Sequence, residues 1–250
     1  MLELVERTLD EVLPAATVRP AILHEAMRYA VGTGGKRIRP LICLASSIAV
    51  GGTAEDARYP AAAIELLHNY TLVHDDLPAM DNDVERRGQP TVWKRFGEAN
   101  AILVGDALEA LAFAVAAKAP RKVAEIVAVL GEKGVGVVEG QVEDIAQEKE
   151  VDFIYLHKTA DLFIAAAKMG ALAGGGTAEQ VAALGEFARN LGLAFQYEDD
   201  LLDGDSPYSR ERTEALVREL TDAAIAALKE LPGDTAFLRQ LAAKLVGRTK

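Results

Sequence analysis

Segments with the periodicity of amphipathic helices follow one another along almost the whole chain, and this succession constrains the fold more than any other feature. Few segments alternate apolar and polar residues as strands would. The chain is 50% hydrophobic but only 6% aromatic, so its core has to come from Ala, Leu, Val and Ile side chains. Long runs rich in Ala, Leu, Glu and Arg favour helices. The sequence therefore predicts one all-α domain over residues 1–250, a bundle of about ten helices.

The predicted helices are separated by glycines, prolines and short charged loops. They cover residues 2–13, 19–31, 38–50, 54–77, 99–118, 121–132, 153–173, 178–203, 210–231 and 235–246. A glycine-punctuated stretch follows residue 132 and runs to residue 147, and a charged loop occupies residues 81–88.

The composition limits which partners the protein could bind and which cellular compartment it could occupy. The 27 Lys and Arg against 38 Asp and Glu give a formal net charge of −11, which argues against a nucleic-acid partner. The single cysteine, Cys43, excludes an internal disulfide and suits a reducing compartment. No signal sequence is evident, and charges or glycines are expected to interrupt every apolar run before membrane-spanning length. We expect a cytoplasmic protein without stable membrane insertion.

Two aspartate clusters dominate the chemistry of the chain, and each ends an apolar, helix-patterned segment. They are Asp75, Asp76 and Asp81 (the first acidic motif) and Asp199, Asp200 and Asp203 (the second acidic motif). Burying so much like charge is prohibitive unless cations neutralise it. Carboxylate oxygens without Cys or His ligands select Mg²⁺, which commonly shares its coordination with substrate phosphates. Two such clusters facing each other would trap a diphosphate.

Helical spacing places the first acidic motif on a defined face. His68, Leu72 and Asp75 lie at i, i+4 and i+7 and share one side of their helix. Pro78 breaks the helix, so the chain can bend and return Asp81 toward Asp75. The alternative is a solvated acidic helix end. We disfavour it because carboxylates at a helix C-terminus oppose the dipole and need compensation.

The second acidic motif has the matching arrangement. Gln196, Asp199 and Asp203 lie at i, i+3 and i+7 and follow the apolar run 191–195, so this face is predicted to point inward. Asp200 lies beside it and would support the metal site or bind a water on the metal.

Basic residues gather in two places near helix ends. Lys36, Arg37 and Arg39 follow two glycines at the start of a helix, where backbone N–H groups and cationic side chains together make an anion site. Arg86 and Arg87 come soon after the first acidic motif. Each set alone would also fit an ordinary basic surface.

Three further residues have alternative interpretations. Lys158 lies in an apolar helix and either extends its amine to solvent or holds the charge of a ligand. His74, directly before Asp75, is typical of metal phosphohydrolases, but that chemistry needs further separated His ligands and the chain has only 4 His in all. Cys43 is expected to be a core residue.

With these residues assembled, the chain resembles the trans-isoprenyl diphosphate synthases (the polyprenyl synthetases), most of all the bacterial farnesyl diphosphate synthase type. The resemblance rests on six segments found in the family's order. They are Gly34-Gly-Lys-Arg-Ile-Arg-Pro40, residues 67–83 with the first acidic motif, Arg86-Arg-Gly-Gln-Pro-Thr91 continued by residues 96–108, Gly140-Gln141, His157-Lys-Thr159, and residues 195–203 with the second acidic motif. It covers residues 20 to 205 or so.

The resemblance implies the all-α isoprenoid synthase bundle with a central apolar cavity, in most members a homodimer. It assigns the diphosphate of isopentenyl diphosphate to Lys36, Arg39, His68 and Arg87. It assigns the allylic diphosphate to Arg86, Lys158, Thr159 and Gln196. It implies three Mg²⁺ ions held by Asp75, Asp81 and Asp199, supported by Asp76, Asp200 and Asp203.

The implied reaction ionises the allylic diphosphate, adds the alkene of isopentenyl diphosphate to the resulting cation and removes a proton. It needs no protein nucleophile, and the chain shows no Ser/His/Asp or Cys/His signature. Tyr70 lies five residues before Asp75 and resembles the aromatic residue that stops chain growth at C15 in this family. The predicted product is farnesyl diphosphate, with geranylgeranyl diphosphate as the alternative.

The resemblance weakens after Asp203, where the family's lysines are missing and residues 204–208 lead almost directly into the next helix. The stretches 148–152 and 118–134 are also short. If these connections are genuine, we expect weaker closure over the allylic substrate and reduced turnover. Two other functions stay open. A class I terpene cyclase would not need Lys36, Arg39 and His68, and a non-catalytic regulatory subunit would usually have lost one acidic motif.

Overall fold

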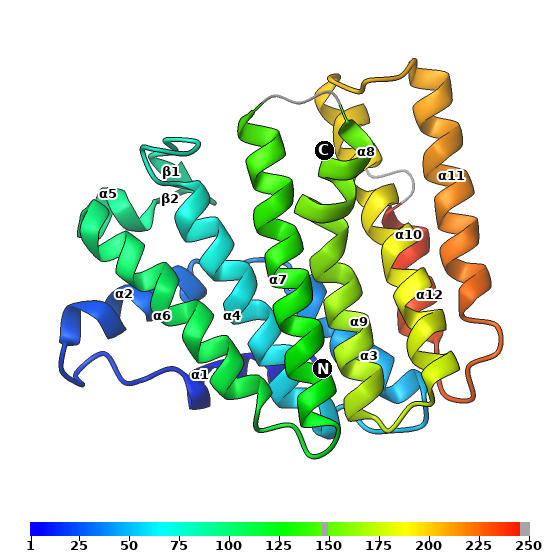
Figure 1. The fold of residues 1–250 in the computed structure, drawn as a ribbon, viewed down its shortest axis with the longest axis horizontal. Helices are drawn as coiled ribbons and strands as arrows, with labels where there is room; N and C mark the ends of the chain where they lie inside the picture. The colour runs from blue at the N-terminus through cyan, green and yellow to red at the C-terminus, as the bar shows by residue number, and fades with distance from the viewer. Residues whose placement is uncertain (147–149, 246–250) are drawn as a thin grey trace.

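The computed structural model describes residues 1–146 and 150–245, and these form the predicted all-α bundle (Figure 1). The α-helices are α1 (Leu2–Val12), α2 (Ala21–Gly32), α3 (Ile38–Ala49), α4 (Arg58–Asp75), α5 (Val92–Phe96), α6 (Glu98–Ala116), α7 (Val123–Ile145), α8 (Val151–Ile154), α9 (Asp161–Ala173), α10 (Ala178–Asp203), α11 (Arg210–Ala227) and α12 (Ala236–Leu245). A 3₁₀ turn, η1 (Glu55–Ala57), precedes α4, and a π-helical turn, η2 (Tyr155–Ala160), joins α8 to α9.

Helix α9 is the centre of the bundle, between α7 and α10 in Figure 1. Every residue of α9 is buried except Lys168. It packs against α3, α4, α7 and α10. Its many alanines let neighbouring helices approach closely, which explains how a chain poor in aromatic residues builds a dense core.

Three segments differ from the sequence prediction. The glycine-punctuated stretch continues the helix, so α7 is unbroken from Val123 to Ile145. Glycine lowers helix propensity by about 1 kcal/mol, but tertiary packing overrides that cost here. The helix predicted over 153–173 is interrupted by η2. The charged loop contains a small antiparallel hairpin, β1 (Glu85–Arg86) with β2 (Gln89–Pro90). The shortened stretch before Phe153 includes residues 147–149, which lie outside the described residues.

Helix α6 corrects the expectation that every apolar run is too short to cross a membrane. By length and composition α6 could span one, with a mean hydropathy of 1.6. A core helix of a soluble protein passes the same test, and one side of α6 packs on α4 with Val104, Leu108 and Ala112 fully buried. This feature is therefore weak support for a membrane segment.

Candidate functional site

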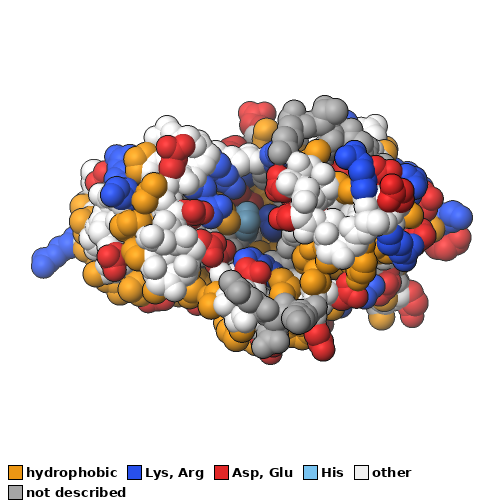
Figure 2. Space-filling model, turned by 90° about the horizontal axis from the view of Figure 1, so that it is seen from above, with side chains coloured by type: hydrophobic (Ala, Val, Ile, Leu, Met, Phe, Trp, Pro, Cys, Tyr) orange, Lys and Arg blue, Asp and Glu red, His pale blue; other side chains and the backbone are white. Residues whose placement is uncertain are grey.

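The two acidic motifs lie at the same end of the bundle. Helices α4 and α10 both run upward in Figure 1, and each ends in one of the motifs. Figure 2 looks down on this end and shows a central hollow, with acidic side chains around it and basic side chains and a histidine inside it.

The chain turns back after α4, as the sequence predicts. The backbone N–H of Asp81 donates to the carbonyl of Asp75 at 2.9 Å, and that of Asn82 donates to the carbonyl of Leu77 at 3.1 Å. The helix ends at Asp75, slightly before the predicted position. The first acidic motif is therefore a helix end plus a folded-back loop, with Asp75 half-buried and Asp81 exposed.

The electrostatic setting of Asp75 favours a bound cation. Burial raises the pKa of the Asp75 carboxyl to about 6; the nearby Lys158 lowers it and Asp81 raises it. A bound cation would stabilise the ionised form of a carboxylate in such surroundings.

Asp76, by contrast, already has a protein cation. Its side chain is buried, and its Oδ1 accepts from the Nε of Arg86 at 2.7 Å, with the Nη2 of Arg86 also at 2.7 Å. Burial nevertheless raises the pKa of Asp76 while the Arg86 bond lowers it. Asp76, predicted to support the metal, positions Arg86 in this structure.

The second acidic motif lies within the last turns of α10, which ends at Asp203. Asp200 is buried and held by neutral donors. Its Oδ2 accepts from the hydroxyl of Tyr155 at 2.5 Å, and its Oδ1 accepts from the Nε2 of Gln196 at 3.0 Å. Gln196 in turn accepts from the hydroxyl of Thr159 at 2.9 Å. This chain of bonds joins η2 to α10, and Tyr155 is a member that the sequence analysis missed.

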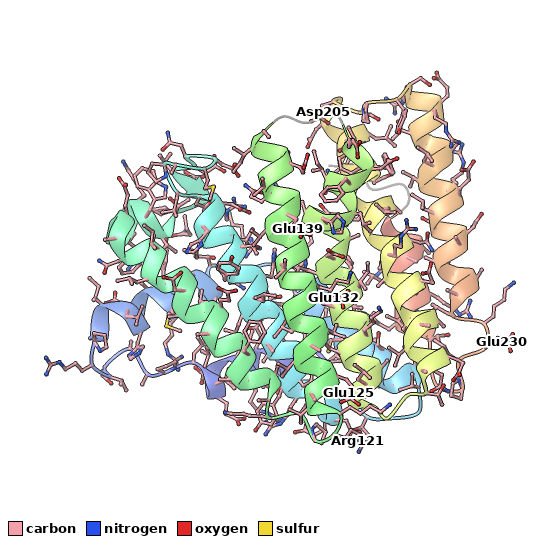
Figure 3. All side chains as sticks on the ribbon, viewed as in Figure 1. Arg121, Glu125, Glu132, Glu139, Asp205 and Glu230 are labelled. Atoms are coloured by element: carbon pink, nitrogen blue, oxygen red, sulfur yellow. The ribbon has the colours of Figure 1, made fainter. Side chains whose placement is uncertain are left out.

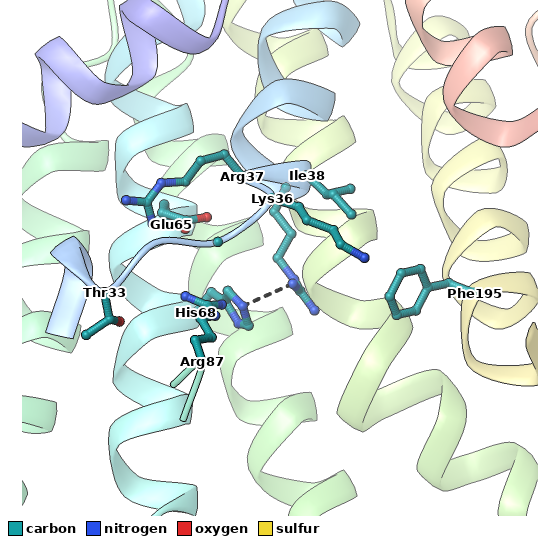
Figure 4. Close-up of a pocket in the computed structure, with 10 residues that line it drawn as sticks. Thr33, Lys36, Arg37, Ile38, Glu65, His68, Arg87 and Phe195 are labelled. Carbon is teal, nitrogen blue, oxygen red and sulfur yellow. Dashed lines mark hydrogen bonds and ion pairs between the residues drawn. The ribbon is translucent and has the colours of Figure 1, made fainter. Parts of the chain in front are cut away.

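Cationic residues line a cavity of about 510 Å³ next to the acidic motifs (Figure 4). Its lining includes Lys36, Arg39, His68 and Arg87, so the structure brings together the four residues predicted to hold one diphosphate. Phe195 of α10 lines the side of the cavity opposite His68 and Arg87, on the right in this view.

The cavity keeps His68 neutral. The Nη1 of Arg39 lies 3.2 Å from the Nε2 of His68. Burial lowers the pKa of Arg39 to about 10, and burial together with the surrounding arginines holds the pKa of His68 well below its ordinary value. Arg87 is fixed by a hydrogen bond to the carbonyl of Gly34. Cations crowded in this way have a strong preference for an anionic ligand.

Arg37 turns away from the open side of the cavity. Its Nη1 donates to the Oε1 of Glu65 at 2.8 Å and its Nε to the Oε1 of Glu6 at 2.8 Å. The backbone of Arg37 is left-handed, with φ at +48°. Glu65 was missed by the sequence analysis, although its position one helical turn before His68 could have pointed to it.

Lys158 is paired within the protein. Its Nζ donates to the Oδ2 of Asp144 on α7, a third residue that the sequence analysis missed. The positive charge of Lys158 also lowers the pKa of the Asp75 carboxyl, against the larger effect of burial.

The donor set fits Mg²⁺. Within residues 1–146 and 150–245, no three acidic, histidine or cysteine side chains converge closely enough to enclose an ion by themselves. Carboxylate oxygens from the two motifs could hold Mg²⁺ when a ligand's phosphate oxygens and waters complete the coordination, which is the way proteins commonly bind this ion.

A smaller cavity of about 120 Å³ opens beneath the first acidic motif between α4 and α7. Tyr70 lines it together with Val137 and Val138, and its role as the floor of a chain pocket stays a prediction. The Tyr70 ring lies edge-on to the imidazole of His74, with ring centroids 5.0 Å apart.

The imidazole of His74 also meets α6. Its Nε2 lies 3.0 Å from the carbonyl oxygen of Ile102. Gly105 makes this approach possible, because a Cβ at that position would overlap the ring. His74 therefore ties the end of α4 to α6, and in the described part of the chain no three His, Cys, Asp or Glu side chains form a metal site around it.

The connection from α10 to α11, residues 204–209, contains no lysine. Gly204 ends α10 in a left-handed conformation, with φ at +80°, and Ser209 caps α11. The family's lysines are thus absent from the described chain on this side of the site.

Comparison with known proteins gives the family. The sequence profile of the polyprenyl synthetases matches residues 20–214, a range that contains both acidic motifs and the cationic cavity. The chain belongs to the polyprenyl synthetase family.

Relatives and solved structures of this family agree in fold and sequence. The chain is 44% identical over 221 residues to the heterodimeric geranylgeranyl pyrophosphate synthase large subunit 1 of Arabidopsis thaliana, which covers 80% of this chain and 58% of that protein. It is 46% identical over 214 residues to a chloroplastic geranylgeranyl pyrophosphate synthase of Catharanthus roseus, covering 80% and 59%. The chain therefore spans less than two thirds of the length of these curated relatives.

Among solved structures, a farnesyl/geranylfarnesyl pyrophosphate (FPP/GFPP) synthase from Zymomonas mobilis superposes with a TM-score of 0.91 at 34% identity, covering 98% of this chain and 97% of that one. The geranylgeranyl pyrophosphate synthetase of Pyrococcus horikoshii Ot3 superposes with a TM-score of 0.90 at 31% identity, covering 99% and 96%. The all-α isoprenoid synthase fold expected from the sequence is confirmed.

Proposed function

We propose that this polyprenyl synthetase condenses isopentenyl diphosphate with an allylic diphosphate in a Mg²⁺-dependent, head-to-tail prenyl transfer. The observation that carries the proposal is the cationic cavity beside the two acidic motifs. The cationic cavity can bind a diphosphate directly, through Lys36, Arg39 and Arg87. The acidic motifs can bind a second diphosphate through bridging cations. Two diphosphate substrates need two such sites of different chemistry.

The residues divide the work between binding and ionisation. Arg39 and Arg87 neutralise the isopentenyl diphosphate, while neutral His68, whose Nε2 accepts from the Nη1 of Arg39, adds no charge. Arg86, held by Asp76, directs its remaining N–H groups toward the allylic diphosphate. Mg²⁺, expected as three ions, would supply charge stabilisation for the departing diphosphate.

The protein also has to protect the cation formed on the allylic carbon. The hydroxyl of Thr159 and the side chain of Gln196 form a bonded pair whose oxygens can face positive charge. Apolar groups such as Phe195 exclude water that would quench the cation. The proton lost at the end of the step can pass to the released diphosphate, so no side chain has to serve as a strong base.

For the product we propose geranylgeranyl diphosphate, a C20 chain. The curated relatives reported above are named geranylgeranyl pyrophosphate synthases, which supports the C20 alternative better than the C15 product predicted from Tyr70. The cavity that Tyr70 lines also has Val137, Val138 and Val142 along its wall, and these small side chains are compatible with a longer product.

We propose a homodimer as the working form. Large apolar side chains are exposed on the outer faces of α6 and α7, including Ile102, Leu103, Val135, Val138 and Val142. A second copy would cover them. The alternative, a subunit that acts with a different chain, is favoured by one observation, namely the relative named as a heterodimeric large subunit.

The test is product analysis with purified protein, Mg²⁺, labelled isopentenyl diphosphate and dimethylallyl, geranyl or farnesyl diphosphate in turn. We expect a C20 product that disappears with chelator, and a longer one from Tyr70→Ala but not from Tyr70→Phe. A C15 product would restore farnesyl diphosphate. No product without a partner chain would favour the heteromeric subunit.

A further inference from the structure

A buried ion cluster lies against η2, and no step of the proposed reaction uses it. Asp161, the first residue of α9, has a side chain only 1% exposed, and its Oδ2 lies 2.8 Å from the Nδ1 of His157. Its Oδ1 forms an ion pair with the Nζ of Lys133 on α7 at 3.1 Å. Because a buried carboxylate is costly without good partners, both contacts are needed to hold Asp161 inside the bundle.

A glycine on α7 leaves space for the carboxylate of this cluster. A Cβ at Gly136 would overlap the carboxylate of Asp161, so only glycine fits at that position. Lys133 lies one helical turn earlier on the same helix. Burial lowers the pKa of Lys133, but the hydrogen bonds and charges of Asp161 and Glu132 together outweigh that effect and raise the pKa overall, so the lysine stays charged.

The π-helical turn above the cluster directs successive side chains to different partners. His157 meets Asp161 within the turn, and Lys158 reaches Asp144 on α7. Thr159 bonds to Gln196 on α10. A π turn contains an extra residue relative to an α-helix and is frequently kept at functional sites.

Relaxation of this turn would misdirect two side chains of the proposed allylic site. Loss of the extra residue would rotate the following positions by about 100°. Lys158 and Thr159 would then leave Asp144 and Gln196. Some local interaction has to hold the turn open, and the bond between His157 and Asp161 spans it from within.

We propose that Asp161 is a positioning residue that, through His157 and with Lys133 as its counter-ion, fixes η2 and so aims Lys158 and Thr159 at the allylic diphosphate. The inference rests on the proposed prenyl transfer and names a residue outside the diphosphate sites. It predicts that Asp161 affects one substrate and not the other, because the cationic cavity is lined by residues 33–39, by α4, by Arg87 in the turn after β1 and by Phe195 of α10, all of which lie outside η2.

The test compares Asp161→Ala with the conservative Asp161→Asn, which keeps an acceptor for His157. Asp161→Ala should raise the KM for the allylic diphosphate by about 10- to 100-fold, the range typical when a group that orients a ligand-binding residue is lost. The KM for isopentenyl diphosphate should stay within about twofold, and Asp161→Asn should recover most of the allylic KM. The matched control is Glu132→Gln. Glu132 is an exposed carboxylate on the front of α7 that also pairs with Lys133, and its loss should change neither KM (Figure 3).

A second measurement keeps the inference testable if Asp161→Ala folds poorly. His157→Leu, at a less buried position, should give the same allylic defect, and its effect should not add to that of Asp161→Asn in the double variant. Binding of inorganic pyrophosphate with Mg²⁺, followed by calorimetry, should weaken in parallel. Equal changes in both KM values, or a lower Tm with both KM values intact, would overturn the proposal. A wild-type protein without turnover would refute the proposed function alone, since pyrophosphate binding still tests the role of Asp161.

Discussion

The two acidic motifs have similar sequences but are neutralised in different ways. In each, the second aspartate is buried and bonded to protein groups. For Asp76 the partner is a cation, Arg86, whereas for Asp200 the partners are the neutral donors Tyr155 and Gln196. The first motif therefore carries part of its own counter-charge. In the second motif, Asp200 is held by hydrogen bonds from neutral donors.

Geometry adds to this difference. The first motif combines a helix end with a loop that is folded back by the bond between Asp81 and Asp75. The second lies wholly within α10. Both oppose the dipole at a helix C-terminus, so both gain from cations. The comparison indicates that the protein supplies a cation to Asp76 and neutral donors to Asp200.

The largest effect should come from Asp75, the half-buried carboxylate of the first motif. Asp75→Ala should lower kcat/KM by about 10³-fold, because it removes a carboxylate that holds cations against the departing diphosphate. Product formation from labelled isopentenyl diphosphate measures it. Asp83→Asn, in the same loop and exposed, is the matched control and should stay close to wild type. A similar loss in both variants would mean that overall acidity of the loop matters rather than Asp75.

Removal of Arg86, the cation paired with Asp76, should show how much the buried Asp76 carboxylate costs the fold. Arg86→Met leaves Asp76 without its ion pair and should lower the free energy of unfolding by roughly 2 to 3 kcal/mol. Urea unfolding of ligand-free protein measures this. The double variant Arg86→Met/Asp76→Leu, which removes both charges, should regain most of the stability. If Arg86→Met alone has wild-type stability, the first motif does not depend on its own counter-charge.

Stability should depend on pH in the window set by Asp75. The folded-state pKa of Asp75 is about 6, above its ordinary value of 3.8. The ligand-free folded protein therefore binds more protons than the unfolded chain between these values, and its stability falls as the pH rises from about 4 to 6, by roughly 1 to 3 kcal/mol. Thermal unfolding at pH 5 and 7 measures it. Saturating Mg²⁺ with pyrophosphate, or Asp75→Asn, should flatten this dependence.

The smallest effect should come from the neutral donors of the second motif. Tyr155→Phe removes one hydrogen bond to Asp200 and should cost about 1 kcal/mol of stability while weakening Mg²⁺-dependent pyrophosphate binding severalfold. Tyr197→Phe is the matched control, because its hydroxyl bonds Asp152 outside the motif at 2.8 Å. It should cost similar stability and leave binding unchanged. Equal binding losses would remove the distinction between the two motifs.

Local pattern predicted much of the fold and the members of the site. The helix ends near residues 12, 50 and 203 follow from glycine and proline positions, and the return of Asp81 follows from Pro78. His68, Arg39 and Lys36 meet in one cavity, as predicted from their motifs. These features depend on residues close in sequence or on a family resemblance.

The remaining features depend on contacts between distant residues. Tyr155 and Asp200 are 45 positions apart, and no helical spacing links them. The π turn has an ordinary helical sequence, and its side chains meet Asp144 on α7 and Gln196 on α10, which are distant in sequence. The glycines of α7 suggested an interrupted helix, whereas in the structure Gly136 leaves room within α7 for the carboxylate of Asp161. Periodicity reports which face of a helix is apolar and carries no information about such pairings.

The close approach of His74 to Gly105 has a consequence for how mutations in this protein would be interpreted. In a saturation-mutagenesis library selected for product formation, Gly105 should tolerate as few replacements as Asp75, although it offers no ligand atom. One added methyl group would push the imidazole, and with it the last turn of α4, out of place. A map of mutational sensitivity would therefore include Gly105 on α6 in the apparent active site, although Gly105 only leaves room for the His74 ring.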